Sequence, residues 1–290
     1  METESPAATE GALARIPPEI YFVTSAIFHY VGPAFAVLLF ANVAPLGVAW
    51  LRIGSAAAIF ALWQRPWISF GALSTVDRRR VVALGFVLAA MNITFYLALA
   101  RLPLATVGAI EFVGPIMLAA IGLRGPRNTV ALVLAVVGAY YLMNLKLEGA
   151  PLGYAFAFAN CALFVLYIVL GHRLAADGGA RGVQRLAAAM LVAAFAASPV
   201  GIADALPALQ NPTWLAAGIG VGICSSVIPY VLDQLAMARL PRATYALMLT
   251  LLPATATVVG ILVLRQIPTQ QEWTGIAMVI AAVAIHRRAQ

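Results

Sequence analysis

The sequence predicts an all-α integral membrane protein of ten transmembrane helices, arranged as two inverted repeats of five helices each. Of the 290 residues, 63% are hydrophobic and only 10% are charged, against roughly 25% charged in a soluble domain. The apolar residues form long blocks, as a bilayer requires. A heptapeptide also occurs twice with six identical positions, at 100–106 and 238–244, at an offset of 138 residues (239 − 101). This offset is close to half of the chain and indicates two related halves.

Ten apolar blocks are long enough to be membrane spans. They cover residues 20–41, 44–63, 80–100, 103–122, 128–145, 152–172, 183–203, 213–237, 242–264 and 270–286. Pro103 and Pro241 open the fourth and ninth blocks, where the first helical turn needs no N–H donor. The predicted domains are a cytoplasmic tail over 1–19, a first repeat over 20–147, a second, inverted repeat over 148–286 and a cytoplasmic C-terminus over 287–290.

The Lys and Arg residues favour one side of the predicted membrane. With the N-terminus inside, the outer loops hold only Arg101, Lys146 and Arg265, and Arg52 lies within a block. The inner segments hold Arg15, Arg65, Arg78, Arg79, Arg80, Arg124, Arg127, Arg173, Arg181, Arg185, Arg239, Arg242, Arg287 and Arg288. This bias places both termini in the cytoplasm. Because five is odd, the second repeat crosses the membrane inverted, as in many secondary transporters. The alternative is a duplication that only enlarges a helix bundle.

Ionisable side chains inside the apolar blocks are costly and mark functional sites or satisfied structural pairs. Glu111, near the middle of the fourth block, is a candidate to bind a substrate ammonium or to carry a proton; the alternative is a protonated or arginine-paired structural residue. Arg52 is a candidate to bind a substrate carboxylate through two parallel N–H donors of its planar guanidinium. The alternative is a structural pairing with Glu111 or with helix-end carbonyls. Asp233, in the eighth block, joins the same site or is an interfacial partner of Arg239.

Neutral polar residues complete the predicted substrate site. His29 and Tyr30 precede a Gly-Pro pair, where a broken helix can expose backbone groups to a polar cavity. Asn92 and Tyr96 are four residues apart and therefore share one helix face. Interhelical hydrogen bonds are the alternative for each of these residues. The predicted substrate-binding residues are His29, Tyr30, Arg52, Asn92, Tyr96, Glu111, Asn160, Tyr230 and Asp233.

Two stretches resemble a known family. The segment 91–115, which reads MNITFY, then ARLP, then EFVGP, is similar to the ten-span EamA group of the drug/metabolite transporter superfamily, and within it to bacterial threonine/homoserine and aromatic amino-acid exporters. Pro229-Tyr230, Asp233 and a second ARLP extend the likeness over residues from about 20 to 286. The resemblance implies a ten-helix inverted-repeat fold with a central cavity, and the export of small metabolites, amino acids first among them.

The chain departs from that family at two places in its ninth block. Many members carry Glu-Pro early in this span, whereas here Leu252 precedes Pro253. They often end the span with Gly-Glu, where this chain has Arg265 and Gln266. Any coupling or selectivity role that those acids have elsewhere in the family is therefore in doubt here.

Other functions lack their sequence signatures. The chain has no HExxH, G-x-S-x-G or Walker A motif, so it is predicted not to be an enzyme and not to use ATP directly. Sugar phosphates or drugs are the alternative cargo, although phosphate needs several cationic groups and Arg52 is the only Lys or Arg away from the ends of the blocks. We predict no cofactor, no metal and no nucleic-acid partner. The predicted protein is a monomer in contact with lipid in the bacterial inner membrane, with a small molecule as its substrate.

Overall fold

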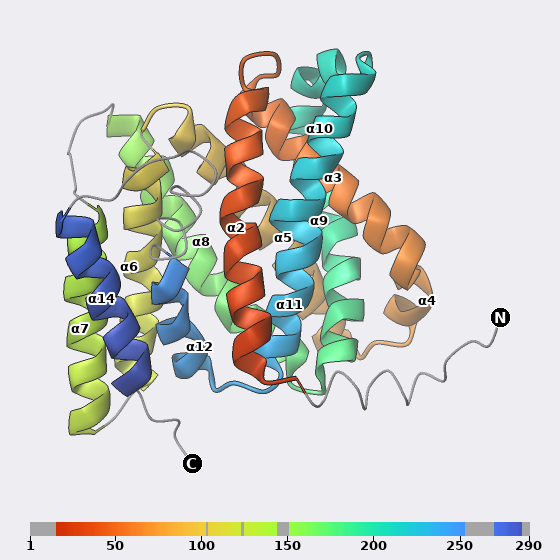
Figure 1. The fold of residues 1–290 in the computed structure, drawn as a ribbon. Coiled ribbons are helices and arrows are strands. Elements are labelled where there is room, and N and C mark those ends of the chain that lie inside the picture. Colours follow the sequence, from red (N-terminus) through yellow and green to blue (C-terminus); the bar gives the residue numbers. More distant parts are fainter. Residues whose placement is uncertain (1–15, 103, 123–124, 144–150, 253–269, 286–290) are drawn as a thin grey trace.

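The computed structural model describes residues 16–102, 104–122, 125–143, 151–252 and 270–285, which are helical apart from short turns (Figure 1). The all-α prediction is confirmed for these residues, none of which lies in a strand. Sequence features outside the described residues are Arg15, Pro103, Arg124, Lys146, Pro253, Arg265, Gln266, Arg287 and Arg288.

Helices lie at each predicted block, and one begins within five residues of the start of every block. They are α2 (Pro18–Leu39), α3 (Pro45–Gln64), α4 (Pro66–Gly71), α5 (Thr75–Leu99), α6 (Leu104–Gly122), α7 (Pro126–Met143), α8 (Pro151–Ala175), α9 (Gly179–Leu209), α10 (Pro212–Gly222), η1 (Ile223–Val227), α11 (Ile228–Met237), α12 (Arg242–Met248), η2 (Leu249–Leu251) and α14 (Gln270–Ile285). The ninth block is described only as far as Leu252.

Five of these helical segments are long and apolar enough to cross a membrane. They are α3, α5, α8, α9 and the continuous segment Pro212–Met237, which includes α10, η1 and α11. The short helix α4 was not expected from the sequence. It follows Arg65, whose left-handed φ of 44° ends α3 and turns the chain.

Local sequence explains where several helices begin. Proline is the first residue of α2, α3, α4, α7, α8 and α10, since its fixed φ suits the first turn and its missing N–H is not needed there. Before α5, the Ser74 hydroxyl accepts a hydrogen bond from the Asp77 N–H. Before α10, the Asn211 side chain accepts from the N–H groups of Thr213 and Trp214.

Small residues allow the helices to approach closely. The pair α3 and α9 shares the most extensive contact among the described elements, followed by α7 with α14 and α5 with α8. A Cβ atom at Gly201 of α9 would lie 2.7 Å from the Leu46 carbonyl oxygen of α3. A Cβ atom at Gly47 would lie 2.8 Å from the Ala205 nitrogen. Such contacts between backbones replace the hydrophobic effect as the source of helix association in lipid.

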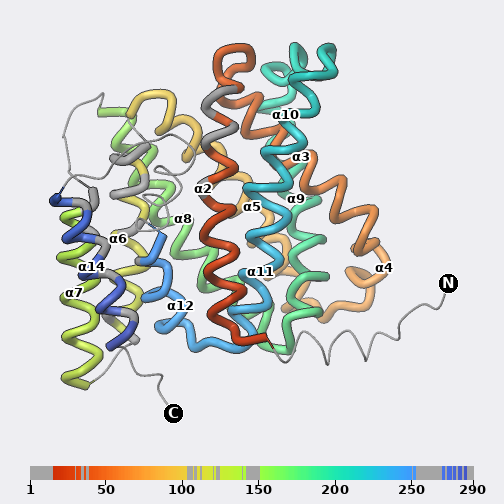
Figure 2. Tube along the Cα trace, in the orientation of Figure 1, coloured from red at the N-terminus to blue at the C-terminus, as the bar shows by residue number. Residues whose placement is uncertain are grey.

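The helices form two groups that α5 and α8 join (Figure 1). On one side α6, α7, α12 and α14 enclose a small alanine-rich cluster that includes Ala119, Ala135 and Ala282. On the other side stand α2, α3, α9, α10 and α11, and Figure 2 shows α2 passing close to α11. The largest buried cluster draws residues from α2, α3, α5, α8, α9, α11 and α12. The centre of the molecule therefore lies where α2, α5, α8 and α11 meet.

The packing of α10 on α3 predicts different effects of one substitution at two nearby glycines. At Gly222 a Cβ atom would collide with the Ser55 hydroxyl and lie 2.9 Å from the Arg52 carbonyl oxygen, whereas at Gly220 no atom lies within 4 Å. We expect Gly222→Ala to lower the free energy of unfolding by roughly 1–3 kcal/mol, because α3 must move away from α10. Gly220→Ala should leave it unchanged or slightly raised. Thermal unfolding of both variants in one detergent measures this, and equal melting temperatures would contradict the close packing at Gly222.

Candidate functional site

Arg52 of α3 supplies a hydrogen bond that a proline removes from the helix containing η1. Pro229 lacks an N–H, so the carbonyl of Ser225, four residues earlier, has lost its usual helical donor. The Arg52 Nη2 donates to this carbonyl at 2.6 Å, and the Arg52 Nε donates to the Ser226 hydroxyl at 2.9 Å. The side chain of Arg52 is buried, and η1 is wound as a π-helix. Arg52 thus fixes α3 to the irregular segment between α10 and α11.

Asp233 of α11 is the centre of a second polar group and is only 1% exposed. Its Oδ1 accepts from the Ser25 hydroxyl at 2.7 Å, and its Oδ2 accepts from the Tyr167 hydroxyl at 2.9 Å. The Nε2 of His29 lies 3.5 Å from Oδ2, and the His29 ring packs edge-on against Tyr230. These side chains come from α2, α8 and α11, so the carboxylate ties three helices together.

Glu111 of α6 is half-buried and is held by Asn160 of α8, whose Nδ2 donates to the Glu111 Oε1 at 2.8 Å. Glu111 also interacts electrostatically with His29 and Arg52. Pro115 has no N–H to donate to the Glu111 carbonyl, which loosens α6 beside this carboxylate. The two carboxylates and the arginine therefore belong to one polar cluster, although different helices hold each of them.

Asn92 and Tyr96 of α5 face the interior of the protein, with exposures of 2% and 0%. The Asn92 amide donates to the Leu88 carbonyl of its own helix at 2.8 Å and lies beside the Tyr230 hydroxyl. The Tyr96 hydroxyl lies close to Arg52. The two residues share one helix face as expected, but Asn92 lies beside Tyr230 and Tyr96 lies beside Arg52.

Several buried polar atoms of this cluster have no hydrogen-bond partner, namely His29 Nε2, Tyr96 Oη, Asn160 Oδ1 and Ser225 Oγ. Buried polar atoms are normally paired, so this cluster retains donors and acceptors for a polar ligand or water. The Asn160 Oδ1 is an acceptor beside the Glu111 carboxylate, whereas the Tyr96 hydroxyl can donate. Among the described residues, no three His, Cys, Asp or Glu side chains gather as metal ligands.

Two pairings left open by the sequence are wrong. Asp233 forms no ion pair with Arg239, whose Nη1 donates instead to the Ile16 carbonyl at 2.7 Å. α11 ends at Met237, so Arg239 lies in the following turn and not on the helix that carries Asp233. Arg52 and Glu111 interact electrostatically but form no hydrogen bond or ion pair, because the guanidinium is occupied by η1 and the carboxylate by Asn160.

The sequence reasoning omitted several members of the cluster from the predicted site. Ser225 and Ser226 form a polar pair inside an apolar block, which was a usable signal. Tyr167, seven residues after Asn160, falls on the same helix face, as this spacing predicts, although the predicted substrate-binding residues did not include it. Ser25 gave no signal, since single serines are common in membrane helices. Tyr30 lies within α2, but its side chain lies outside what the structure describes.

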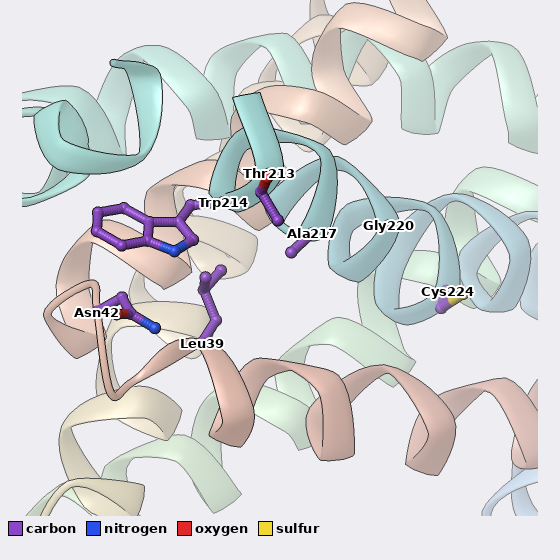
Figure 3. Close-up of a pocket in the computed structure, with 7 residues that line it drawn as sticks. All are labelled: Leu39, Asn42, Thr213, Trp214, Ala217, Gly220 and Cys224. Carbon is purple, nitrogen blue, oxygen red and sulfur yellow. The ribbon is translucent and has the colours of Figure 1, made fainter. Parts of the chain in front are cut away.

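A pocket of about 450 Å³ opens between the end of α2 and α10 (Figure 3). Leu39 and Asn42 form one wall, Trp214 and Ala217 form the other, and Cys224 of η1 lies at one end. None of the nine predicted site residues lines this pocket. It nevertheless reaches η1, whose next two residues accept the hydrogen bonds of Arg52.

Comparison with known proteins places the chain among transporters. The model of the EamA-like transporter family matches residues 151–287. The threonine/homoserine exporter RhtA of Escherichia coli (strain K12) is 31% identical over 279 residues, which cover 94% of this chain and 92% of that protein. The RhtA of Salmonella typhimurium (strain LT2) is 32% identical over 255 residues, with 87% and 84% covered. A solved crystal structure with 18% identity has the same fold, with a TM-score of 0.65 over 91% of this chain and 94% of that one.

The two cysteines test whether the pocket admits water. Cys224 lines the pocket and is partly exposed, whereas Cys161 is buried. We expect a hydrophilic thiol reagent to modify Cys224 much faster than Cys161 in detergent or lipid nanodiscs, as followed by intact-protein mass spectrometry. Ala217→Trp fills the pocket and should slow the modification of Cys224 only. Equal modification rates for the two cysteines would show that the pocket is closed to solvent.

Proposed function

Because the chain belongs to the EamA-like transporter family, we propose that it exports amino acids across the inner membrane by alternating access. The cargo proposed is threonine and homoserine, or aromatic amino acids. The likeness to the threonine/homoserine exporter extends over nearly the whole chain and supports this cargo class. The observation that carries the proposal is the Glu111–Asn160 pair, which offers a carboxylate to a cargo ammonium inside an apolar helix bundle.

The geometry of this pair suits an ammonium group. Asn160 donates its Nδ2–H to Glu111. The Oδ1 of the same amide has no hydrogen-bond partner and can accept from the cargo beside the carboxylate. A cargo ammonium carries three N–H donors and would meet the Glu111 carboxylate and this Oδ1 together. The Tyr96 hydroxyl, buried and without a hydrogen-bond partner, is a neutral donor for a cargo carboxylate. Both ends of a zwitterion would then find partners in the cluster.

A phosphate-bearing cargo fits this cluster less well. Phosphate recognition relies on several cationic donors. Arg52 already donates to Ser225 and Ser226. The described part of the cluster contains no second guanidinium or ammonium group. Releasing Arg52 would leave the Ser225 carbonyl without a donor at Pro229. We therefore favour amino acids over sugar phosphates.

The packing pattern supports two inverted repeats, 20–147 and 148–286. If the repeats are related by a two-fold axis in the membrane plane, equivalent helices should pack on each other or form equivalent pairs. The second helices of the two halves, α3 and α9, are in extensive contact, and so are the last helices, α7 and α14. The pair α5–α8 has its counterpart in α11–α2. Exchange of the two half-structures is then the route between inward-open and outward-open states.

The proposed inversion predicts that the two ARLP motifs lie on opposite faces of the membrane. Arg101 follows α5 and Arg239 follows α11, and both side chains are exposed. In a background carrying Cys161→Ala and Cys224→Ala, we expect an impermeant maleimide to label Arg101→Cys on intact cells. Arg239→Cys should be labelled only after permeabilisation. Labelling of both positions from outside would contradict the inversion.

Counterflow in proteoliposomes tests the cargo and the role of Glu111. The wild-type protein should exchange labelled threonine, homoserine or an aromatic amino acid, and should ignore sugar phosphates. Glu111→Gln keeps an oxygen that accepts from Asn160 but loses the charge. We expect exchange to fall by about 10- to 100-fold, since a charge-assisted hydrogen bond contributes roughly 1.5–3 kcal/mol. Undiminished exchange by a folded Glu111→Gln protein would remove Glu111 from the cargo site, and no amino-acid exchange by the wild type would reject the function.

A further inference from the structure

The proposed cargo site does not use the second carboxylate of the cluster, Asp233, which is fully buried. Asp233 is 1% exposed, and the Ser25 and Tyr167 hydroxyls donate to its two oxygens. These neutral donors satisfy its hydrogen-bonding capacity in part, but they bring no positive charge. A carboxylate inside a membrane bundle needs a cation or a proton to offset its charge. His29, with its Nε2 3.5 Å from the Asp233 Oδ2, is the side chain in the described residues that can supply it.

Among the described groups that contact Asp233, His29 is the one that can become positive. α2 contributes Ser25 and His29, and α8 contributes Tyr167. The Tyr245 hydroxyl on α12 and the neighbouring Tyr230 on α11 interact electrostatically with the carboxylate.

In the described part of the chain, the remaining elements packed on α11 do not bring a cation to Asp233. From η1, the Ser226 hydroxyl and the Ser225 carbonyl are engaged by Arg52, and Cys224 lines the pocket. α9 also packs on α11, but its Arg185 pairs with Asp177 and Asp77.

His29 links the two carboxylates of the cluster. It lies against Asp233 and also interacts electrostatically with Glu111. Its side chain is 17% exposed against 1% for Asp233, although the Nε2 that faces Asp233 is itself buried. Pro33 has no N–H for the His29 carbonyl, and α2 can therefore bend at this turn and make or break the His29–Asp233 contact.

We propose that Asp233 and His29 form the proton-binding site that couples export to the proton gradient; this rests on the proposed function. A proton from the outer side binds the pair when the site faces outward, and it leaves to the cytoplasm when the site faces inward. Cargo moves in the opposite direction. A protonated His29 and a cargo ammonium would both lie near Glu111, so each disfavours binding of the other. This mutual exclusion is what an exchange of proton for cargo requires.

The test separates coupling from cargo binding in proteoliposomes that contain the full chain. Asp233→Asn removes the negative charge, while its amide oxygen still accepts from Ser25. Asp177→Asn is the matched control, because Asp177 is an exposed partner of Arg185. Two quantities are measured for each protein: counterflow of a labelled amino acid at equal pH, and cargo accumulation driven by an imposed pH gradient. A pH-sensitive dye inside the vesicles follows the accompanying proton movement.

We expect the wild type and Asp177→Asn to accumulate cargo and move protons with it. Asp233→Asn should lose accumulation and proton movement while counterflow persists. His29→Gln should do the same and replaces Asp233→Asn if that variant does not fold. Retained accumulation in both variants would overturn the proton site, as would loss of counterflow in a folded Asp233→Asn protein. Wild-type counterflow without pH-driven accumulation would overturn this site alone, whereas absence of wild-type counterflow would reject the proposed function itself.

Discussion

The contact between Arg52 and η1 is the interaction on which the centre of the structure depends. In hydrocarbon, a backbone carbonyl without a donor costs several kcal/mol, so a proline inside a membrane helix is tolerated only where another group replaces its missing N–H. Arg52 is that group for the Ser225 carbonyl. Because Arg52 belongs to α3, these hydrogen bonds also fix the position of α3 against α10 and α11. Gly222 approaches Ser55 closely beside the same contact.

In three helices, a proline lies four residues after a member of the polar cluster. Pro33, Pro115 and Pro229 each withhold a donor from the carbonyl four residues earlier, which belongs to His29, Glu111 and Ser225 respectively. Each of these residues is part of the polar cluster. Each of these helices therefore lacks one backbone donor at the depth where their polar side chains meet, and in η1 the backbone is wound as a π-helix. Irregular backbone at that depth is acceptable only where protein or a polar cavity surrounds it.

Hydropathy predicted the helices well but could not predict how they face one another. The extent of each apolar block along the sequence indicates roughly where a helix lies, and every block contains one. The rarity of charge in these blocks was also enough to select Glu111, Arg52 and Asp233. Their partners could not be derived, because helix rotation is set by packing of small residues along the whole interface. The Asn160–Glu111 and Tyr167–Asp233 bonds join residues 49 and 66 positions apart.

The partners of the two carboxylates lie on one helix, and this suggests how the two sites communicate. Asn160 and Tyr167 are seven residues apart on α8, so they share a face and stand about 10 Å apart along the helix axis. Asn160 holds Glu111 of α6, and Tyr167 holds Asp233 of α11. A tilt or rotation of α8 would change both contacts together, because a packed helix moves as a unit rather than deforming locally. In the proposed transport cycle, α8 would therefore be the element through which the two carboxylates are coupled.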